Sequence, residues 1–377
     1  MLRPETESDL SEAIRAANGP LSICGGNTRG IAPGGTMLSA SAMSGITLYE
    51  PGALTLVARA GTPVAEIDAA LAAEGQRLAF EPADYRRLLG TDGTPTIGGV
   101  IAANVSGPRR IQGGAARDYA LGVRFVDGSG TVIKNGGRVM KNVTGYDLVK
   151  LLSGSFGTLG VLTEVSLKVL PVPETSGTVV IYGLDDNGAV SAMSQAMGSP
   201  FEVTGAAYAA GIRGDEAVCA LRVEGFDASV TYRLQRLKEL LAPLGAETEI
   251  LSASDTVVIW ENLRDVAPFD GAAGDVWRVS CAPSAAPGLA AAAAATRHYY
   301  DWAGGLIWLN TPAGTDLRAR LGVFDGHATL VRGNRTQGIF HPQSKGVEKL
   351  GAGLRAKFDP RGILNRGLMS PATGEMV

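Results

Sequence analysis

Residues 21–30 read LSICGGNTRG, a short apolar run that leads directly into a glycine turn. The run Leu21 to Cys24 is typical of a buried strand, because it is apolar, short and bounded by turn residues. The turn after it contains Gly25, Gly26, Asn27, Thr28 and Gly30. Glycines at a strand end let successive backbone N–H groups converge on an oxygen anion, since no Cβ is in the way. The stretch therefore predicts a strand whose end meets a phosphate or diphosphate group.

Two further glycine segments lie in the first half of the chain. Residues 94–110 read TPTIGGVIAANVSGPRR, and their small side chains suit a backbone that closely approaches another group. Residues 154–160 read GSFGTLG. Each cluster alone fits an ordinary turn equally well in a chain with 51 glycines, but their joint occurrence favours a shared ligand. The Rossmann and P-loop glycine motifs are absent from the sequence, which disfavours a Rossmann cofactor site.

The composition is that of an ordinary folded chain. Lys and Arg total 34 against 37 Asp and Glu, a formal net charge of −3, so charge alone does not favour nucleic acid or an anionic membrane surface. Cys24, Cys219 and Cys281 are too scattered for a disulfide framework. We expect no membrane span and a cytoplasmic location, because the sequence has no long apolar run and no signal peptide.

Hydrophobic periodicity divides the 377 residues into regions of different character. Short strands and glycine loops dominate as far as Pro173, and Asp127-Gly128-Ser129-Gly130 indicates a hairpin turn. Beyond Pro173, apolar strands alternate with helical stretches, which is typical of a separate α+β domain. The expected domains are 1–173, 174–335 and a C-terminal segment, 336–377, that returns to the first.

Five segments in a fixed order resemble a known family. They are LSICGGNTRG (21–30), EPGALTLVARAGTPVAEI (50–67), TPTIGGVIAANVSGPRR (94–110), RVMKNVTGYDLVKLLSGSFGTLGVLTEVSLKVLP (138–171) and FDPRGILNRG (358–367). The set resembles the p-cresol methylhydroxylase-type (PCMH-type, or vanillyl-alcohol oxidase-type) FAD-binding family, and within it the FAD-binding E subunits of bacterial glycolate oxidases. The resemblance implies an α+β fold: a two-part PCMH-type FAD-binding domain, an α+β cap domain and a returning C-terminal segment.

The resemblance also implies which residues bind FAD, which we expect to be held non-covalently. The first diphosphate loop matches Gly25, Gly26, Asn27 and Thr28, and the second matches Thr96, Gly98, Gly99, Asn104 and Gly107. Gly160 and Val161 match a loop on the adenine side, and Asn365 matches an asparagine close to the flavin. Cys24 lies near these loops but fits better as a small apolar residue than as a covalent flavin attachment. If φ at Gly26 is positive, Gly26→Ala costs about 1–2 kcal/mol and weakens FAD binding.

The function that the resemblance implies is that of an oxidoreductase acting on the CH–OH group of glycolate, a small 2-hydroxy acid. The implied partners are a catalytic FAD subunit and an iron–sulfur subunit, which would also hold the chain at the inner face of the membrane. Two alternatives stay open. The chain would serve assembly or electron relay without catalysis, or it would be a stand-alone FAD oxidoreductase for another 2-hydroxy acid or alcohol.

The chain departs from the family pattern before its C-terminal motif. Catalytic sibling subunits and 2-hydroxy acid dehydrogenases have a Gly-Glu-His-Gly stretch with metal and substrate ligands, whereas residues 339–344 here read IFHPQS. With only His298, His327 and His341 in the chain, we expect no metal site. We therefore name no catalytic residue.

Three further groups carry both a functional and a structural interpretation. Arg109-Arg110 would clamp a diphosphate or carboxylate, or would be ordinary surface charges. His341 would act as a base beside the flavin, or would be a structural histidine with its hydrogen bonds satisfied. His298-Tyr299-Tyr300 is expected to end the helix of the alanine run 290–295 and to serve packing.

Overall fold

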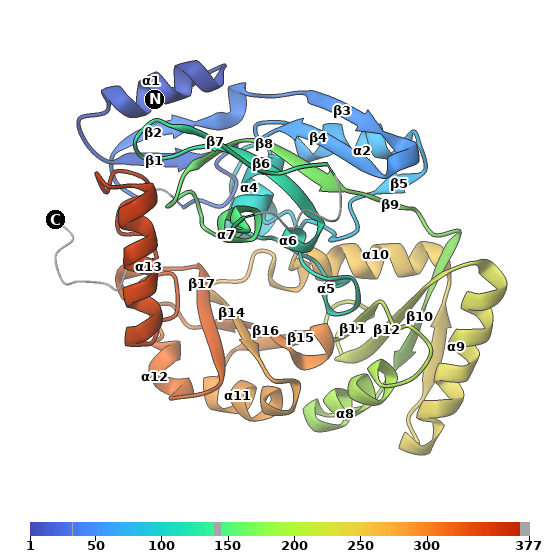
Figure 1. The fold of residues 1–377 in the computed structure, drawn as a ribbon. Helices are drawn as coiled ribbons and strands as arrows, with labels where there is room; N and C mark the ends of the chain where they lie inside the picture. Colours follow the sequence, from blue (N-terminus) through green and yellow to red (C-terminus); the bar gives the residue numbers. More distant parts are fainter. Residues whose placement is uncertain (32, 139–144, 370–377) are drawn as a thin grey trace. The chain divides into compact units, whose positions relative to one another are not determined.

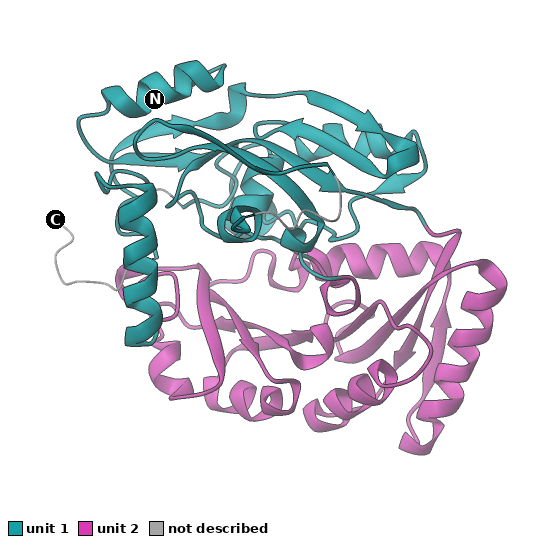
Figure 2. Ribbon diagram, in the orientation of Figure 1, with its two compact units in different colours: residues 1–106, 114–172, 342–377 teal, residues 107–113, 173–341 magenta. Residues whose placement is uncertain are grey.

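A computed structural model of the chain describes residues 1–31, 33–138 and 145–369. The chain forms two compact units: unit 1 contains residues 1–106, 114–172 and 342–377, and unit 2 contains residues 107–113 and 173–341 (Figure 2). These ranges differ from the expected domains by one residue at Pro173, which belongs to unit 2, and by more in two other places. Unit 2 extends to His341, and it includes residues 107–113, which sequence analysis assigned to the first domain.

Unit 1 is built on a five-stranded sheet with the order β3-β4-β8-β6-β7 (Figure 1). Its neighbouring strands are antiparallel. They are β3 (Ile46–Glu50), β4 (Thr55–Arg59), β6 (Ala120–Val126), β7 (Val132–Gly136) and β8 (Val161–Lys168). Two small sheets pair β1 (Leu21–Cys24) with β2 (Thr36–Ser39) in parallel and β5 (Gln76–Arg77) with β9 (Leu170–Pro171) antiparallel. The predicted hairpin between β6 and β7 is confirmed, and the Asp127 carboxylate accepts the Ser129 and Thr131 N–H groups in its turn.

The first helix of unit 1 begins at a local capping signal. In α1 (Glu7–Ala16), Thr6 and Asp9 form a capping box, and Leu10 and Ile14 are fully buried on one face. The others are α2 (Val64–Ala72), α3 (Arg86–Leu89), α4 (Ile97–Ala102), α6 (Ala116–Tyr119), α7 (Leu148–Leu152) and α13 (Lys345–Phe358), with 3-10 turns η1 (Ala40–Ala42) and η2 (Pro51–Ala53). Residues 139–144, part of the fourth family segment, lie outside the described residues.

The C-terminal segment returns to unit 1, as the resemblance implies. The Leu21 N–H donates to the Ile363 carbonyl over 2.7 Å, which joins the segment to β1. The Arg361 guanidinium donates to the carbonyls of Ile14 and Ala17 at 3.0 and 2.7 Å, and these carbonyls lie at the end of α1. Ile363 and Leu364 complete a buried cluster with residues of α1 and β1. Ile363 and Leu364 are thus part of the core of unit 1.

Unit 2 is built on an eight-stranded antiparallel sheet with the order β13-β10-β12-β11-β15-β16-β14-β17. Its strands are β10 (Thr175–Ile181), β11 (Gly205–Ala209), β12 (Val218–Gly225), β13 (Thr248–Leu251), β14 (Asp275–Cys281), β15 (Arg297–Asp301), β16 (Leu306–Thr311) and β17 (Gly326–Arg332). Its helices are α5 (Arg110–Gly113), α8 (Asp186–Met197), α9 (Asp227–Leu241), α10 (Ala253–Arg264), α11 (Ala286–Ala293) and α12 (Leu317–Leu321). Its 3-10 turns are η3 (Ala242–Leu244), η4 (Ala267–Phe269), η5 (Pro283–Ala285), η6 (Trp302–Gly304) and η7 (Arg335–Gln337).

Different helices pack on the two faces of this sheet. On one face, helices α8, α9, α11 and α12 enclose a large apolar core with Trp277, Val279 and Leu221. On the other face, α10 packs through Trp260, whose indole N–H donates to the Thr178 hydroxyl over 2.9 Å. This arrangement confirms the expected α+β character of the second domain.

The expectation that His298-Tyr299-Tyr300 ends the alanine helix is wrong. Helix α11 ends at Ala293, and Arg297–Asp301 forms strand β15, which pairs with β16 and, through Tyr300, with β11. Tyr299 and Tyr300 are both fully buried. Aromatic residues favour strands that pack on both faces, and this tertiary environment overrides the helical preference of the alanines before them.

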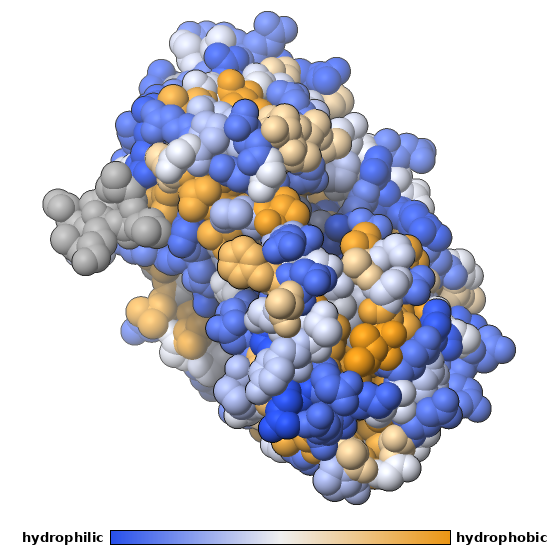
Figure 3. Space-filling model, turned by 90° about the vertical axis from the view of Figure 1, so that its right-hand side faces the viewer, coloured by the Kyte–Doolittle hydropathy of each residue, from blue (hydrophilic) through white to orange (hydrophobic). Residues whose placement is uncertain are grey.

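Figure 3 shows one face of the molecule, coloured by hydropathy. Hydrophilic residues cover most of the face in Figure 3, and apolar residues lie in separate groups between them. Within the described residues, no helix is both long enough and apolar enough to cross a membrane.

Candidate functional site

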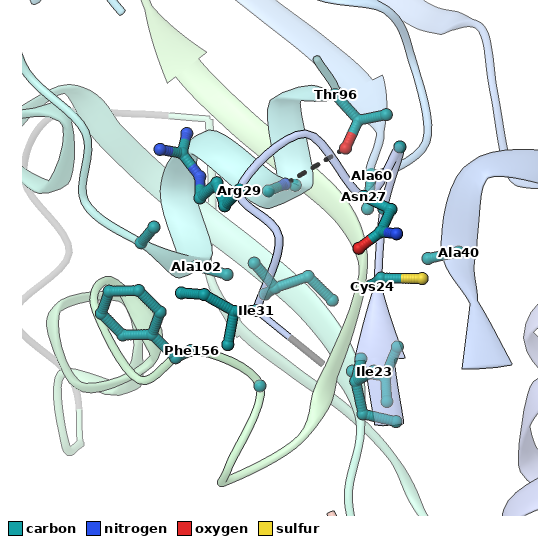
Figure 4. A pocket seen from close by; sticks show the side chains of 18 of the residues that line it. Ile23, Cys24, Asn27, Arg29, Ile31, Ala40, Ala60, Thr96, Ala102 and Phe156 are labelled. Atoms are coloured by element: carbon teal, nitrogen blue, oxygen red, sulfur yellow. Dashed lines mark hydrogen bonds between the residues drawn. The ribbon is translucent and has the colours of Figure 1, made fainter. Parts of the chain in front are cut away.

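A pocket of unit 1 lies where β1 ends and the glycine turn begins (Figure 4). It contains about 840 Å³ of space, including open solvent at its mouth. Most of the predicted cofactor residues line it, namely Gly25, Gly26, Asn27, Thr28, Thr96, Gly98, Gly99, Gly160, Val161 and Asn365. The fold therefore brings together four segments that are far apart in the sequence.

Two predicted cofactor residues do not line this pocket. Asn104 adopts a left-handed backbone with φ 49°, and its side-chain oxygen accepts the Arg117 N–H over 3.0 Å. Gly107 belongs to unit 2, where its carbonyl accepts the indole N–H of Trp302 over 3.1 Å. Through these hydrogen bonds, both residues hold the segment that follows α4 in place.

The glycine turn after β1 presents backbone donors to the pocket. In the described part of the chain, no hydrogen bond uses the N–H groups of Gly26, Asn27 or Thr28. Asn27 has φ 56°, which places the turn in the left-handed region. Successive N–H groups without protein acceptors form an anion-binding concavity, which is the chemistry that a diphosphate requires. The donor set thus fits the diphosphate of FAD.

The second glycine segment supports this turn. The N–H of Gly98 donates to the Ala60 carbonyl over 2.8 Å, and the N–H of Gly99 donates to Thr96 Oγ1 over 3.3 Å (Figure 4). A Cβ on Gly25 would lie 2.2 Å from that same hydroxyl oxygen. Because the Gly98 and Gly99 N–H groups already have acceptors in the protein, this segment positions the first turn rather than offering those two donors.

The condition that φ at Gly26 is positive is not met. Gly26 is not among the glycines with positive φ, so its conformation is open to other residues. A Cβ at this position would instead lie 1.7 Å from the Thr94 carbonyl oxygen. Glycine is required here because two main-chain segments approach each other closely, and not because the backbone is left-handed.

Asn365 joins three segments at the edge of the pocket. Its side-chain oxygen accepts the Ile23 N–H over 2.7 Å, and its amide nitrogen donates to the Phe156 carbonyl over 2.7 Å. The residue is only 3% exposed and has φ 44°, a conformation that asparagine tolerates better than most residues. This one side chain therefore links β1, the GSFGTLG loop and the returning C-terminal segment.

Sequence analysis did not single out several residues of the pocket wall. Ile31, Ala102 and Phe156 form an apolar side that suits a flat ring system (Figure 4). Arg29 lies next to the glycine turn, with its guanidinium 5.6 Å from the ring of Tyr85, and desolvation lowers the pKa of this guanidinium. Phe156 lies within a glycine loop that the sequence did mark, whereas no local signal distinguishes Arg29 from a surface charge.

Cys24 also lines the pocket. Its thiol donates to the Leu38 carbonyl over 3.7 Å, and burial raises the thiol pKa above its ordinary value. A raised pKa disfavours the thiolate, which is the reactive form of cysteine. These observations support the interpretation of Cys24 as a strand-end residue.

The other candidate groups have structural partners within unit 2. Arg109 forms a buried ion pair with Glu224. His341 Nδ1 accepts the Ala328 N–H over 3.2 Å, which joins it to β17. His298 lies 3.1 Å from the carboxylate of Asp186. Among the described residues, no group of three His, Cys, Asp or Glu side chains is arranged to hold a metal ion.

The chain is similar to known FAD-binding proteins. Residues 1–136 match the family described as FAD binding domain. The chain is 35% identical over 356 residues to glycolate oxidase subunit GlcE of Escherichia coli, covering 93% of this chain and 92% of that protein. It is 35% identical over 158 residues to glycolate oxidase subunit GlcD of Bacillus subtilis, covering 42% of this chain and 32% of that protein. The fold is similar to that of p-cresol methylhydroxylase, with a TM-score of 0.74, 13% identity and coverage of 100% and 89%.

Fold and sequence together define a class of protein, an FAD-dependent oxidoreductase with a PCMH-type fold. Its cofactor is FAD. The chain belongs to the FAD-binding oxidoreductase family that includes the glycolate oxidase subunits.

Proposed function

We propose that this chain is the FAD-binding subunit of a heteromeric glycolate oxidase (glycolate dehydrogenase) that oxidises glycolate to glyoxylate. The observation that carries the proposal is the similarity to GlcE, which covers 93% of this chain and 92% of that protein. The similarity to GlcD covers only 42% of this chain, which is consistent with a related FAD subunit as a separate partner. An iron–sulfur subunit is the third component. The complex works in the cytoplasm and reaches the inner face of the membrane through its partners.

The proposal assigns the pocket of unit 1 to FAD. The N–H groups of Gly26, Asn27 and Thr28 receive the diphosphate, because none of them has an acceptor within the described residues. The apolar side with Ile31 and Phe156 packs against a ring of the dinucleotide. Asn365 holds β1 and the loop of Phe156 together through its two side-chain hydrogen bonds. We expect non-covalent binding, because Cys24 is the cysteine that lines the pocket and burial raises the pKa of its thiol.

The reaction is a two-electron oxidation. Glycolate loses two electrons and two protons when its CH–OH group becomes the aldehyde of glyoxylate. Bound FAD supplies a two-electron acceptor for the hydride from the substrate Cα. The iron–sulfur partner then carries the electrons away. This chain contributes cofactor binding. The substrate carbon is oxidised either at the flavin of this chain or at the flavin of the related FAD subunit.

The test compares the purified chain with the complex assembled from all three subunits. Visible spectra are recorded anaerobically before and after addition of glycolate, and acid precipitation is used to release flavin. We expect a flavin band in the chain, release of the flavin into the supernatant, and bleaching by glycolate in the complex.

The other outcomes separate the alternatives. Bleaching of the isolated chain by glycolate would place the oxidation on this subunit. A different result would overturn the proposal: glycolate bleaches the flavin neither in the chain nor in the complex, but another alcohol or 2-hydroxy acid does. The chain would then be a stand-alone oxidoreductase. A chain that takes up no FAD, in a complex that still oxidises glycolate, would show an assembly subunit instead.

A further inference from the structure

Arg29 is a cation in the wall of the unit 1 pocket, and the proposed function gives it no role. It directly follows residues 25–28, the glycine turn whose N–H groups are proposed to receive the diphosphate. Its side chain is partly buried. In Figure 4 its guanidinium group lies apart from Ile31 and Phe156, which belong to the apolar side of the pocket. The charge of Arg29 therefore belongs to the polar side, next to the turn.

The guanidinium group of Arg29 has open hydrogen-bond donors. Among the residues that the structure describes, this group makes no hydrogen bond and no ion pair. Its contact is with the ring of Tyr85, whose centroid lies 5.6 Å from the guanidinium carbon. An aromatic ring stabilises a cation through its π face but accepts none of the N–H donors as an oxygen does. These donors are therefore available to a ligand of the pocket.

The charges that face Arg29 come from Asp84 and Tyr85. Both raise the pKa of the Arg29 guanidinium, but burial lowers this pKa by more. The Asp84 carboxylate is already held by Arg86, whose Nε and Nη2 atoms donate to it at 2.9 and 2.6 Å. Arg29 is thus a desolvated cation beside a carboxylate that another arginine occupies. Such a charge is unfavourable in the free chain and is stabilised when an anion binds to it.

The turn that carries Arg29 is fixed by the segment that contains Asp84 and Arg86. The Thr91 hydroxyl donates to the Thr28 carbonyl over 2.8 Å, and Arg86 Nη1 donates to the Gly93 carbonyl over 3.4 Å. The backbone N–H groups of the turn offer partial positive charges without a net charge. An arginine on the next residue adds a full positive charge at the same place.

We propose that Arg29 binds the diphosphate of FAD as its counter-charge and so determines how tightly the chain holds the dinucleotide. A planar guanidinium donates two parallel hydrogen bonds to phosphate oxygens, which backbone N–H groups supplement. The choice of FAD rests on the proposed function, which assigns the pocket to this cofactor. The availability of the cation rests on the contacts of Arg29 itself.

The experiment titrates the apo chain with FAD, ADP and riboflavin and follows binding by calorimetry. ADP carries a diphosphate without the flavin, and riboflavin carries the flavin without a phosphate. We expect Arg29→Gln (R29Q) to weaken the binding of FAD and ADP about tenfold to a hundredfold, the effect of one lost charge-assisted hydrogen bond. Its affinity for riboflavin should equal that of the wild type.

Matched variants separate charge from geometry and from folding. R29K keeps the charge without the planar fork, so it should recover part of the FAD affinity, and it keeps the test open if R29Q fails to fold. R117Q removes an exposed arginine of α6 outside the lining of the pocket, and it should bind FAD as the wild type does.

Unfolding of the apo chain supplies a second measurement. Because the Arg29 guanidinium has no hydrogen-bond partner within the described residues, apo R29Q should unfold at a temperature no lower than that of the wild type. Saturating FAD should raise the unfolding temperature of the wild type more than that of R29Q. A merely structural arginine would give the opposite pattern, with a lower unfolding temperature of the apo variant and unchanged FAD affinity.

Three results would overturn the inference. They are an FAD affinity of R29Q within about twofold of the wild type, a loss of riboflavin affinity with unchanged ADP affinity, and a wild-type chain that binds neither FAD nor ADP. The second result would place Arg29 at the flavin instead.

The inference and the proposed function fail in distinguishable ways. If R29Q binds FAD as the wild type does and the complex oxidises glycolate, Arg29 is not the counter-charge and the proposed function stands. If R29Q loses affinity for FAD and ADP but the wild-type complex does not oxidise glycolate, the proposed function fails and the role of Arg29 stands.

Discussion

Gly26→Ala tests the close approach of the two glycine segments that build the pocket. The added Cβ would lie 1.7 Å from the Thr94 carbonyl oxygen, a distance that must rise to at least 3.0 Å. The obstructing atom belongs to the main chain, so no change of rotamer relieves the contact. A Cβ on Gly93 would likewise lie 1.7 Å from the Gly26 carbonyl oxygen. The turn after β1 must therefore move away from residues 93–94.

The cost of this movement should appear mainly in FAD binding. Overpacking of a well-packed site costs about 1–3 kcal/mol, which corresponds to about a fivefold to 150-fold change in an equilibrium constant. A displaced turn no longer aims the N–H groups of Gly26, Asn27 and Thr28 at one anion. Without FAD the turn is free to relax, so the unfolding temperature of the apo chain should change little.

FAD titration of the apo chain, followed by flavin fluorescence, measures the effect. Gly52→Ala is the matched control, because nothing lies within 4 Å of its added Cβ. Gly98→Ala should be intermediate, since its Cβ would lie 2.6 Å from Ala60 Cβ and 2.8 Å from the Ala60 carbonyl oxygen, contacts that are less close than the 1.7 Å at Gly26. An FAD dissociation constant for Gly26→Ala within about twofold of that for Gly52→Ala would refute the reasoning.

Three further substitutions test other parts of the structure. Asn365→Ala leaves the Ile23 N–H and the Phe156 carbonyl without their partner; at about 1–3 kcal/mol for each buried group, calorimetry should show a lower unfolding temperature together with loss of FAD. Arg109→Gln removes one member of the buried pair with Glu224 and should destabilise the chain by about 3–5 kcal/mol in denaturant titrations, whereas an unchanged midpoint would contradict a structural role. Glu7 has a carboxyl pKa below the ordinary 4.5 because of its hydrogen bond to Arg124. Its contribution is present above pH 4.5 and lost as pH falls through the lowered value, so the difference in unfolding temperature between wild type and Glu7→Gln should narrow below pH 4.5.

Short-range signals in the sequence were sufficient for several elements. Strand Leu21–Cys24 and the hairpin at Asp127-Gly128 follow from residues that lie next to each other, because turn and strand preferences act over a few residues. The ordered glycine segments, compared with a known family, also predicted the PCMH-type fold that the structure shows. The prediction failed at Tyr299 and Tyr300, where pairing with strands β11 and β16 decided the conformation.

The residues themselves thus determined the presence of a glycine turn after β1 and the family to which the chain belongs. Only the tertiary structure decided what each of these residues does. Asn365 meets Ile23 across 342 positions of sequence, and Gly26 is required by the carbonyl of Thr94 rather than by its own φ. Arg109 becomes one half of a buried ion pair, while Arg110 lies on Trp302. Such roles depend on burial and on partners from distant segments, and no local pattern of residues specifies them.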